Sequence, residues 1–188
     1  MSSLNEIKLN GRITTNWNVI TGGPCSGKTT VINILAKRGY KTTIEHARHY
    51  IDTQKELGNA VEAIRANKRE FQMRVLEMQI EEESKLSTED TVFLDRALPD
   101  AVAYYLFLGL DLDDELINAV NTFCYKNIFV LDPLPLIKDY ARREDKKAQL
   151  KIHSLITEVY EMLPCKVTQV PVLPPEERVD FILESIQQ

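Results

Sequence analysis

The residues from Gly22 to Thr29 have the types and the spacing of a phosphate-binding loop. They read Gly-Gly-Pro-Cys-Ser-Gly-Lys-Thr and match G-x-x-x-x-G-K-[ST] at every fixed position. Glycines let the backbone curl so that successive N–H groups face an anion, and a following helix adds its positive N-terminal dipole. The pattern predicts that Lys28 reaches the β- and γ-phosphates of a nucleotide and that the Thr29 hydroxyl completes the coordination of Mg²⁺. The predicted nucleotide-binding residues are Gly22, Gly23, Pro24, Cys25, Ser26, Gly27, Lys28, Thr29 and Thr30.

A carboxylate followed directly by an arginine closes the apolar run Thr91–Asp95. An aspartate at the end of such a strand is where a magnesium-binding carboxylate is expected in a nucleotide-binding fold. ATPases that act as motors usually follow this aspartate with a glutamate that activates water. Arg96 cannot deprotonate water, but it can bind a phosphate or an acceptor group. The pair therefore favours transfer of a phosphoryl group to a small molecule over hydrolysis.

A second carboxylate, Glu45, follows the predicted strand 41–44, and Arg48 lies about one helical turn later. Next to the phosphate loop, this carboxylate could orient or deprotonate an acceptor hydroxyl, or hold a magnesium-bound water. The plainer alternative is a charged helix start with a local ion pair. Glu45 and Asp95 both stay candidates for the catalytic base.

A charged segment, Lys138–Asp145, places two arginines just before a predicted long helix. In a kinase such a segment forms a lid whose arginine neutralises charge that develops on the transferred phosphoryl group. We expect a lid at about 138–146 with Arg142 in this role. A solvated, charged helix start is the alternative.

The elements that must position these groups alternate between buried strands and helices. This alternation predicts an α/β fold with a mostly parallel five-stranded sheet, covered by helices on both faces, and one domain over residues 1–188. Predicted strands are 17–21, 41–44, 91–95, 127–131 and 166–170. Predicted helices are about 28–38, 61–86, 99–109 and 144–163, with a last helix that carries apolar residues at 179, 182, 183 and 186.

The composition is that of a globular protein, with 44% hydrophobic and 27% charged residues in 188. A net charge of −5 argues against a nucleic-acid binder that relies on a basic surface. No apolar run reaches the roughly 18 residues of a membrane span, and no secretory signal is visible, so we expect a cytoplasmic protein. Three cysteines without paired spacing predict neither a disulfide framework nor a zinc site. The three histidines, at 46, 49 and 153, lack ligand spacing and are expected to be structural or at the surface.

Four motifs occur in one order: ITGGPCSGKTT at 20–30, E-x-A-R at 45–48, D-R-A-L-P-D-x-x-x-Y at 95–104 and R-x-E-D at 142–145. Together they resemble a family of small P-loop ATPase and kinase domains. That family is similar to the ribosylnicotinamide kinase domain of the bacterial NAD-synthesis regulator and, more distantly, to deoxynucleoside and thymidylate kinases. The resemblance covers nearly the whole chain from Trp17 onward.

The resemblance implies a P-loop kinase fold and an ATP- and Mg²⁺-dependent transfer to a small-molecule acceptor. Carried over by position, it implies Lys28 and Thr29 on ATP–Mg²⁺, with Asp95 as a second magnesium ligand. It implies that the acceptor contacts Arg48, Arg96 and Tyr104, and that the catalytic residues are Lys28, Glu45, Asp95 and Arg142.

Two other functions stay open at this point. One is a nucleotide-binding switch or slow NTPase that acts through a protein partner, and the other is a polynucleotide 5′-hydroxyl kinase. The second would need a basic groove, which a chain of this net charge can supply only locally. The sequence leaves the acceptor, the choice between ATP and GTP and the oligomeric state undefined.

Overall fold

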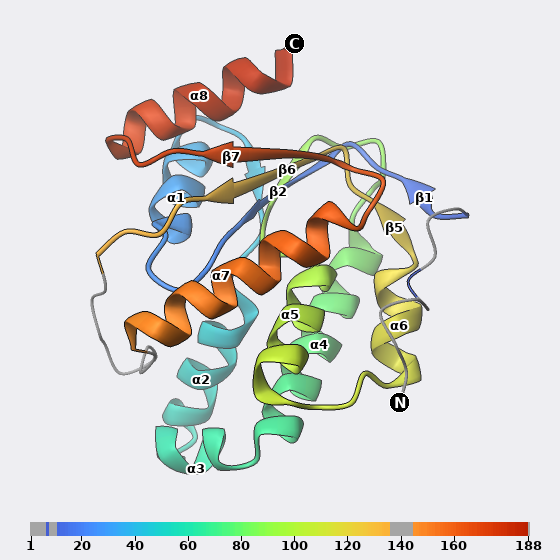
Figure 1. Ribbon diagram of the computed structural model, residues 1–188, viewed down its shortest axis with the longest axis vertical. Coiled ribbons are helices and arrows are strands. Elements are labelled where there is room, and N and C mark those ends of the chain that lie inside the picture. Colours follow the sequence, from blue (N-terminus) through green and yellow to red (C-terminus); the bar gives the residue numbers. More distant parts are fainter. Residues whose placement is uncertain (1–6, 8–10, 136–144, 188) are drawn as a thin grey trace.

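The computed structural model describes residues 7, 11–135 and 145–187, which are built around a sheet of five parallel strands (Figure 1). The strand order across the sheet is β3-β4-β2-β6-β7. The strands are β3 (Lys41–Thr42), β4 (Val92–Asp95), β2 (Trp17–Thr21), β6 (Asn127–Leu131) and β7 (Lys166–Val170). Parallel strands with helices between them confirm the α/β fold expected from the sequence.

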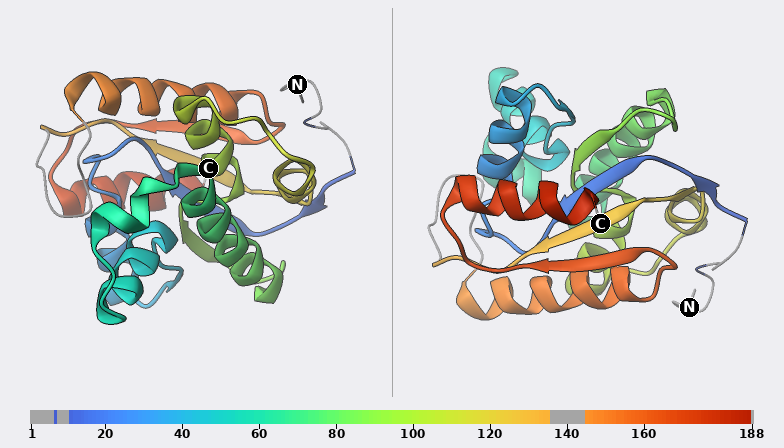
Figure 2. Two further views of the ribbon diagram at one scale, coloured as in Figure 1. Left: turned by 90° about the horizontal axis from the view of Figure 1, so that it is seen from below. Right: turned by 90° about the horizontal axis from the view of Figure 1, so that it is seen from above.

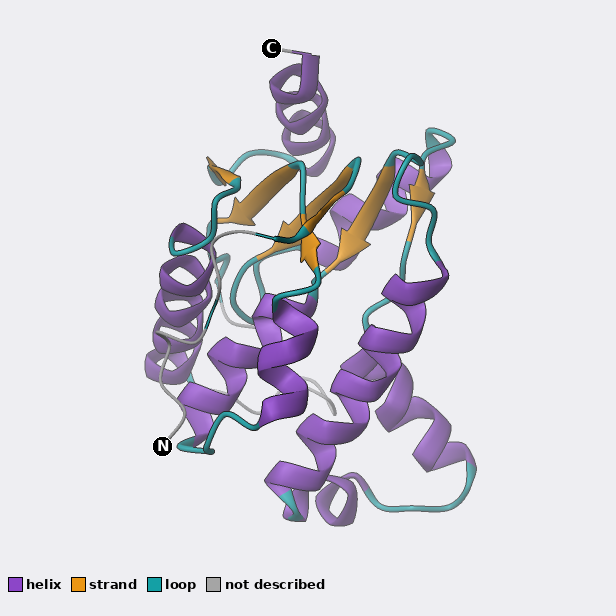
Figure 3. Cartoon of the chain, turned by 90° about the vertical axis from the view of Figure 1, so that its right-hand side faces the viewer, coloured by secondary structure: helices purple, strands orange, loops and turns teal. Residues whose placement is uncertain are grey.

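The three central strands are apolar because both faces of the sheet are buried. Their side chains alternate between two cores. Ile20 and Phe129 pack with α1 (Lys28–Lys37) and α8 (Pro175–Gln187), while Val19 packs on the opposite face. The helices on that second face are α4 (Lys68–Lys85), α5 (Leu98–Leu108) and α7 (Lys146–Glu161). Figures 2 and 3 show the strands between α8 and this larger group of helices.

All five strands end at one edge of the sheet, and the chemistry-bearing residues follow those ends. Ile20 of β2 lies opposite Asp95 of β4 in the parallel register, so the phosphate loop after β2 begins beside Asp95. The α2 helix (His46–Glu56) starts directly after Glu45, near the same edge. In an open parallel sheet, ligands bind at this carboxyl edge.

The long helix predicted over 61–86 is wrong in one respect, because the structure has α3 (Val61–Ala66) and α4 on either side of Asn67. The Asn67 side chain accepts a hydrogen bond from the Glu70 N–H at 3.2 Å and so caps α4. A capping asparagine competes with helix continuation, which the apolar periodicity alone does not reveal.

Short elements account for the other differences. The strand expected at 41–44 has only two residues, and α2 and α6 (Asp114–Val120) were not predicted. A further two-stranded parallel sheet joins β1 (Ile13–Thr14) to β5 (Phe123–Cys124). Each of these elements is stabilised by tertiary contacts rather than by a long apolar pattern of its own.

Two cysteines lie together although their spacing gave no sign of pairing. The sulfurs of Cys124 and Cys165 are 3.6 Å apart across 41 residues of sequence, and both are free thiols. None of the described helices has the length and apolar composition needed to cross a membrane.

Candidate functional site

The loop between β2 and α1 has the backbone shape that its glycines allow. Gly22 has φ 134° and Gly27 has φ 85°, conformations that residues with a Cβ rarely adopt. A Cβ at Gly22 would lie 2.6 Å from the Leu131 carbonyl oxygen of β6. The glycine there is therefore required by close backbone approach as well as by the turn.

Side chains from two distant helices hold the outside of this loop. Gln149 of α7 donates to the Pro24 carbonyl at 2.9 Å, and Arg178 of α8 donates to the Ser26 carbonyl at 2.5 Å. Arg178 is only 2% exposed, and its remaining hydrogen bonds also go to backbone carbonyls. These contacts fix the loop's shape before any anion binds.

Lys28 is folded back onto its own loop. Its ammonium donates to the Gly22 carbonyl at 2.9 Å, to the Gly23 carbonyl at 2.8 Å and to the Ser26 hydroxyl at 3.2 Å. Burial lowers the pKa of Lys28, and the positive charge of Arg96 lowers it further. Because the three donors of an ammonium are already used, a bound phosphate must replace at least one of these acceptors.

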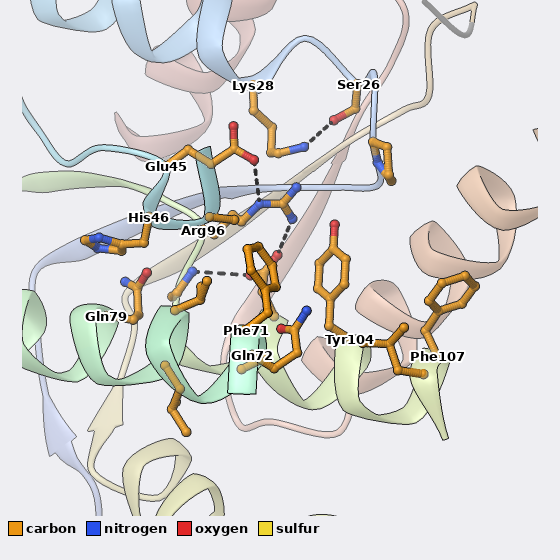
Figure 4. Close-up of a pocket in the computed structure, with 18 of the residues that line it drawn as sticks. Ser26, Lys28, Glu45, His46, Phe71, Gln72, Gln79, Arg96, Tyr104 and Phe107 are labelled. Atoms are coloured by element: carbon orange, nitrogen blue, oxygen red, sulfur yellow. Dashed lines mark hydrogen bonds and ion pairs between the residues drawn. The ribbon is translucent and has the colours of Figure 1, made fainter. Parts of the chain in front are cut away.

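Four charged side chains meet between the loop and the start of α5, and Figure 4 shows two of them, Glu45 and Arg96. Arg96 Nε lies 3.5 Å from Glu45 Oε1, and Arg96 Nη1 lies 3.0 Å from Asp100 Oδ1. Arg48 Nε lies 3.8 Å from Glu45 Oε2, so the local ion pair expected as an alternative is present. The guanidinium of Arg96 also lies over the Tyr104 ring, 5.4 Å from its centroid.

Arg96 is held in this position at a conformational cost. Its φ of 70° is a left-handed conformation, which costs roughly 1–3 kcal/mol for a residue with a side chain. Asp100 fixes the guanidinium and itself accepts hydrogen bonds of 2.6 Å from both Thr21 and Tyr160. Backbone strain at residues other than glycine is found mostly at functional sites, where contacts with the surrounding structure hold the residue in place.

Asp95 has the properties expected of a carboxylate that binds a cation. It is 2% exposed, and its Oδ1 has no hydrogen-bond partner within the described residues. Burial raises the pKa of Asp95, and the nearby charge of Glu45 raises it further. A divalent cation would satisfy the free oxygen and compensate the buried negative charge, so this donor set fits Mg²⁺.

A cavity of about 280 Å³ opens from the phosphate loop toward α4 and α5 (Figure 4). The loop from Pro24 to Thr29 forms one end, and Glu45 and Arg96 line it next to the loop. Much of the remaining wall is apolar or aromatic. The side chains that complete this wall include His46, Phe71, Gln72, Val75, Leu76, Gln79, Tyr104, Phe107 and Leu108.

The structure brings most of the expected site residues together but not all of them. Lys28, Thr29, Glu45, Arg96 and Tyr104 line the cavity. The other expected site residues among those described do not line it: Gly22, Gly23, Thr30, Arg48 and the buried Asp95. Arg142 and most of the expected lid at 138–146 lie outside the described residues.

The cavity wall contains residues that the sequence reasoning did not select. His46, expected to be structural or at the surface, is buried at this wall, and Phe71 was expected only as part of an apolar helix stripe. Gln72 and Gln79 are polar, buried and seven residues apart, which places both on one side of α4. Two glutamines at this spacing on a core-facing helix are a signal that could have been used.

A family model described as an AAA domain matches residues 17–178. Among curated proteins, none matches the chain. The family match agrees with the motifs, since it covers the span from β2 to Arg178.

Several solved structures have a similar fold, and two of those described next are kinases. NadR protein in complex with NAD and AMP-PNP has a TM-score of 0.66 at 18% identity, with 93% of this chain and 50% of that chain covered. Thymidylate kinase from Ehrlichia chaffeensis has a TM-score of 0.63 at 14% identity, with 93% and 99% covered. Deoxyadenosine kinase from M. mycoides, with products dCMP and dCDP bound, has a TM-score of 0.59 at 14% identity, with 91% and 98% covered.

The chain spans about half the length of NadR and nearly the full length of the two other kinases. At these identities the likeness shows the fold, which is that of a P-loop kinase. Together with the family match, it confirms the resemblance drawn from the motifs.

Proposed function

The chain belongs to the family of AAA domains whose model spans residues 17–178, and from that premise we propose that it is a small-molecule kinase. It transfers a phosphoryl group from ATP, with Mg²⁺, to a nucleoside, a nucleotide or a related metabolite. The observation that carries the proposal is that the phosphate loop and the cavity share one wall, where Glu45 and Arg96 lie. A donor site and an enclosed acceptor site in contact are what direct phosphoryl transfer needs.

Each residue at this junction has a role that fits its chemistry. Lys28 binds oxygens of the transferred phosphate, and Arg96 neutralises charge on the acceptor or on the phosphoryl group. Glu45 lines the cavity whereas Asp95 does not, which supports Glu45 as the group that accepts the proton of the acceptor hydroxyl. Thr29 and Asp95 would hold Mg²⁺, which supplies positive charge to the phosphates when bound.

The cavity wall supports transfer over hydrolysis. Phe71, Val75, Leu76 and Phe107 give the acceptor end an apolar surface, which disfavours free water next to the phosphate. Arg96 occupies the position directly after Asp95, where a hydrolytic ATPase would carry a water-activating glutamate. The similar fold of deoxyadenosine kinase and thymidylate kinase supports an acceptor that contains a nucleoside.

An acceptor panel tests the proposal. ADP release is measured with ATP and Mg²⁺ in the presence of nucleosides, nucleoside monophosphates and pyridine ribosides, and compared with turnover without acceptor. We expect one class to raise turnover well above the blank. Glu45→Gln should then lower kcat at least about a hundredfold with ATP affinity kept. Glu56→Gln, at the exposed C-terminal end of the same helix, is the matched control.

The same panel separates the rival functions. Turnover that no small acceptor raises, but that a protein partner changes, would contradict the kinase and indicate a nucleotide switch. Phosphorylation of an oligonucleotide 5′-hydroxyl, with affinity that falls steeply with salt, would indicate a polynucleotide kinase instead.

A further inference from the structure

Two free thiols face each other at the end of the sheet away from the phosphate loop. The sulfurs of Cys124 and Cys165 are 3.6 Å apart, and either thiol can donate a hydrogen bond to the other. Cys124 Sγ also lies 3.9 Å from the carbonyl oxygen of Pro164, the residue directly before Cys165. Both side chains are half-buried, so a small reagent in solution has access to them.

The strands on either side hold the two cysteines in this contact. Cys165 directly precedes β7, whose first residue, Lys166, pairs with Asn127 of β6. Cys124 ends β5, three residues before Asn127, and pairs with Thr14 of β1. The sulfurs of a disulfide are about 2.05 Å apart, so bond formation needs an approach of about 1.5 Å, which rotation about the two Cα–Cβ bonds can supply.

We propose that Cys124 and Cys165 are a redox-sensitive pair, which a low-molecular-weight disulfide such as oxidised glutathione converts into a disulfide within the chain. The bond should stabilise the fold and leave the nucleotide site unchanged. The third cysteine, Cys25, lies in the phosphate loop beyond the other end of β2 and takes no part. The proposal goes beyond the kinase activity and does not depend on it.

Two thiol–disulfide exchange steps form the bond. The Cys124 thiolate attacks one sulfur of oxidised glutathione, which breaks that disulfide and releases one glutathione thiolate. The Cys165 thiolate then attacks Cys124 Sγ in the mixed disulfide, and the second glutathione leaves as a thiolate. Two protein thiols are oxidised, one glutathione disulfide is reduced, and the two protons of the protein thiols end on the two glutathione molecules.

The surroundings of the pair set this order. Burial raises the pKa of Cys165 to about 12, and its hydrogen bond with Cys124 raises it further, so Cys165 is a poor nucleophile in the reduced protein. The mixed disulfide removes that hydrogen bond. Arg12 is fixed next to the pair, because it donates to the carbonyl oxygens of Val120 at 2.8 Å and Phe123 at 3.2 Å. Its positive charge lowers the pKa of Cys165 and so favours the second step.

The bond closes a ring in the chain that contains β6 and α7. A cross-link of this kind restricts the unfolded chain and so stabilises the folded state. The strands β6 and β7 run from the cysteines toward the end of the sheet that carries the phosphate loop (Figure 1). Each has five residues, so roughly 16 Å of strand separates the bond from that end. Stability should therefore rise while nucleotide binding stays the same.

Disulfide mapping of the full chain tests the proposal. The reduced protein is incubated with excess oxidised glutathione, free thiols are alkylated, and unreduced peptides are identified by mass spectrometry. We expect most chains to contain the Cys124–Cys165 bond, and dithiothreitol to reverse it. The melting temperature of the oxidised chain should rise by about 5–10 °C. Its affinity for a non-hydrolysable ATP analogue should match that of the reduced chain.

Cys124→Ser and Cys165→Ser are matched variants, because each keeps one thiol of the pair. Cys165→Ser should stop at the mixed disulfide of Cys124 and show no comparable rise in melting temperature. Cys124→Ser should react with oxidised glutathione at least about tenfold more slowly than Cys165→Ser, because burial keeps the remaining thiol protonated.

The opposite results would overturn the proposal. They are glutathione that stays on either cysteine of the wild-type chain, a bond formed through Cys25, or unchanged thiols under conditions that oxidise the urea-unfolded chain. A Cys124–Cys165 bond that does not raise the melting temperature, or that changes the affinity for the ATP analogue more than about threefold, would overturn the stabilising role. None of these results bears on the kinase proposal, which the acceptor panel decides.

Discussion

Lys28 already makes three hydrogen bonds within its own loop, and this limits what a phosphate can gain from it. The lysine is buried and its pKa is lowered, so the free protein holds a charge in a place where burial disfavours it. Phosphate oxygens would supply the opposite charge. The residue should therefore contribute to binding and little to folding.

Replacement of this lysine tests that separation. Lys28→Ala should weaken binding of an ATP analogue roughly a hundredfold, the scale of losing charge-assisted hydrogen bonds. Thermal unfolding without ligand should change little, because removal of a buried charge offsets the hydrogen bonds that the Gly22 and Gly23 carbonyls lose. Isothermal titration and a melting curve give the two readings, and wild-type affinity in the variant would contradict the phosphate-loop assignment.

Asp95 and Arg96 are neighbours in sequence with different expected effects. Asp95→Asn should lower turnover at least about a hundredfold through lost metal positioning, while the buried fold stays intact. Arg96→Ala should mainly raise the KM for the acceptor and leave ATP affinity nearly unchanged. Steady-state kinetics of both variants, with circular dichroism for the fold, give the answer. Equal loss of ATP binding in the two variants would instead favour a nucleotide-sensing role.

At the scale of single residues, a candidate was visible in the sequence when it lay within one contiguous motif. The loop ending in Lys28 and the Asp95–Arg96 pair lie in contiguous motifs, so their types and spacing were visible in the sequence. His46 and Gln79 come from different helices and meet only through the packing of α2 on α4. That both residues line one cavity is a property of the fold.

Among the elements, the contact of α8 with the phosphate loop is the one with the clearest consequence. Arg178 crosses from α8 to the Ser26 carbonyl and is almost fully buried. A second α8 contact, from Arg38 directly after α1 to Glu176 and Asp180, is exposed to solvent. Both arginines link α8 to the segment made of the phosphate loop and α1, but Arg178 does so in the interior and Arg38 at the surface.

That contrast provides a matched experiment. Arg178→Ala should reduce the free energy of unfolding by about 2–4 kcal/mol, since buried carbonyls lose their donors, and should weaken nucleotide binding about tenfold. Arg38→Ala should leave both the urea midpoint and nucleotide affinity nearly unchanged, because exposed ion pairs contribute little. Similar effects of the two changes would mean that Arg178 does not position the loop.

Element prediction was accurate where the apolar pattern was long. The strands Trp17–Thr21, Asn127–Leu131 and Lys166–Val170 have the bounds expected from the sequence. The break at Asn67 was missed because a cap decides it, and α2 was missed because few of its 11 residues are apolar. The apolar pattern of a sequence indicates which residues are buried. It predicts an element poorly where few of its residues are apolar.

For the whole molecule, stability should depend on pH through the buried Glu83. Burial raises the pKa of Glu83 to about 7 from an ordinary 4.5, so the folded chain binds a proton that the unfolded chain has released between these values. The native state then binds more protons, and the free energy of unfolding falls as pH rises through this window. The loss is on the order of 3 kcal/mol.

Glu83→Gln isolates this contribution, because the amide does not titrate. Urea unfolding at pH 5, 6, 7 and 8 should show wild-type stability declining more steeply with pH than that of the variant. Other titrating groups act on both proteins and cancel in the difference. Parallel pH profiles would contradict the shifted pKa.

The contact between Arg178 and Ser26 also affects when the nucleotide site forms during translation. A ribosome synthesises Ser26 of the phosphate loop 152 residues before Arg178 of α8. Through most of translation the loop therefore exists without one of the side chains that hold its outer surface. Full affinity for nucleotide should therefore be reached only after α8 has left the exit tunnel and docked.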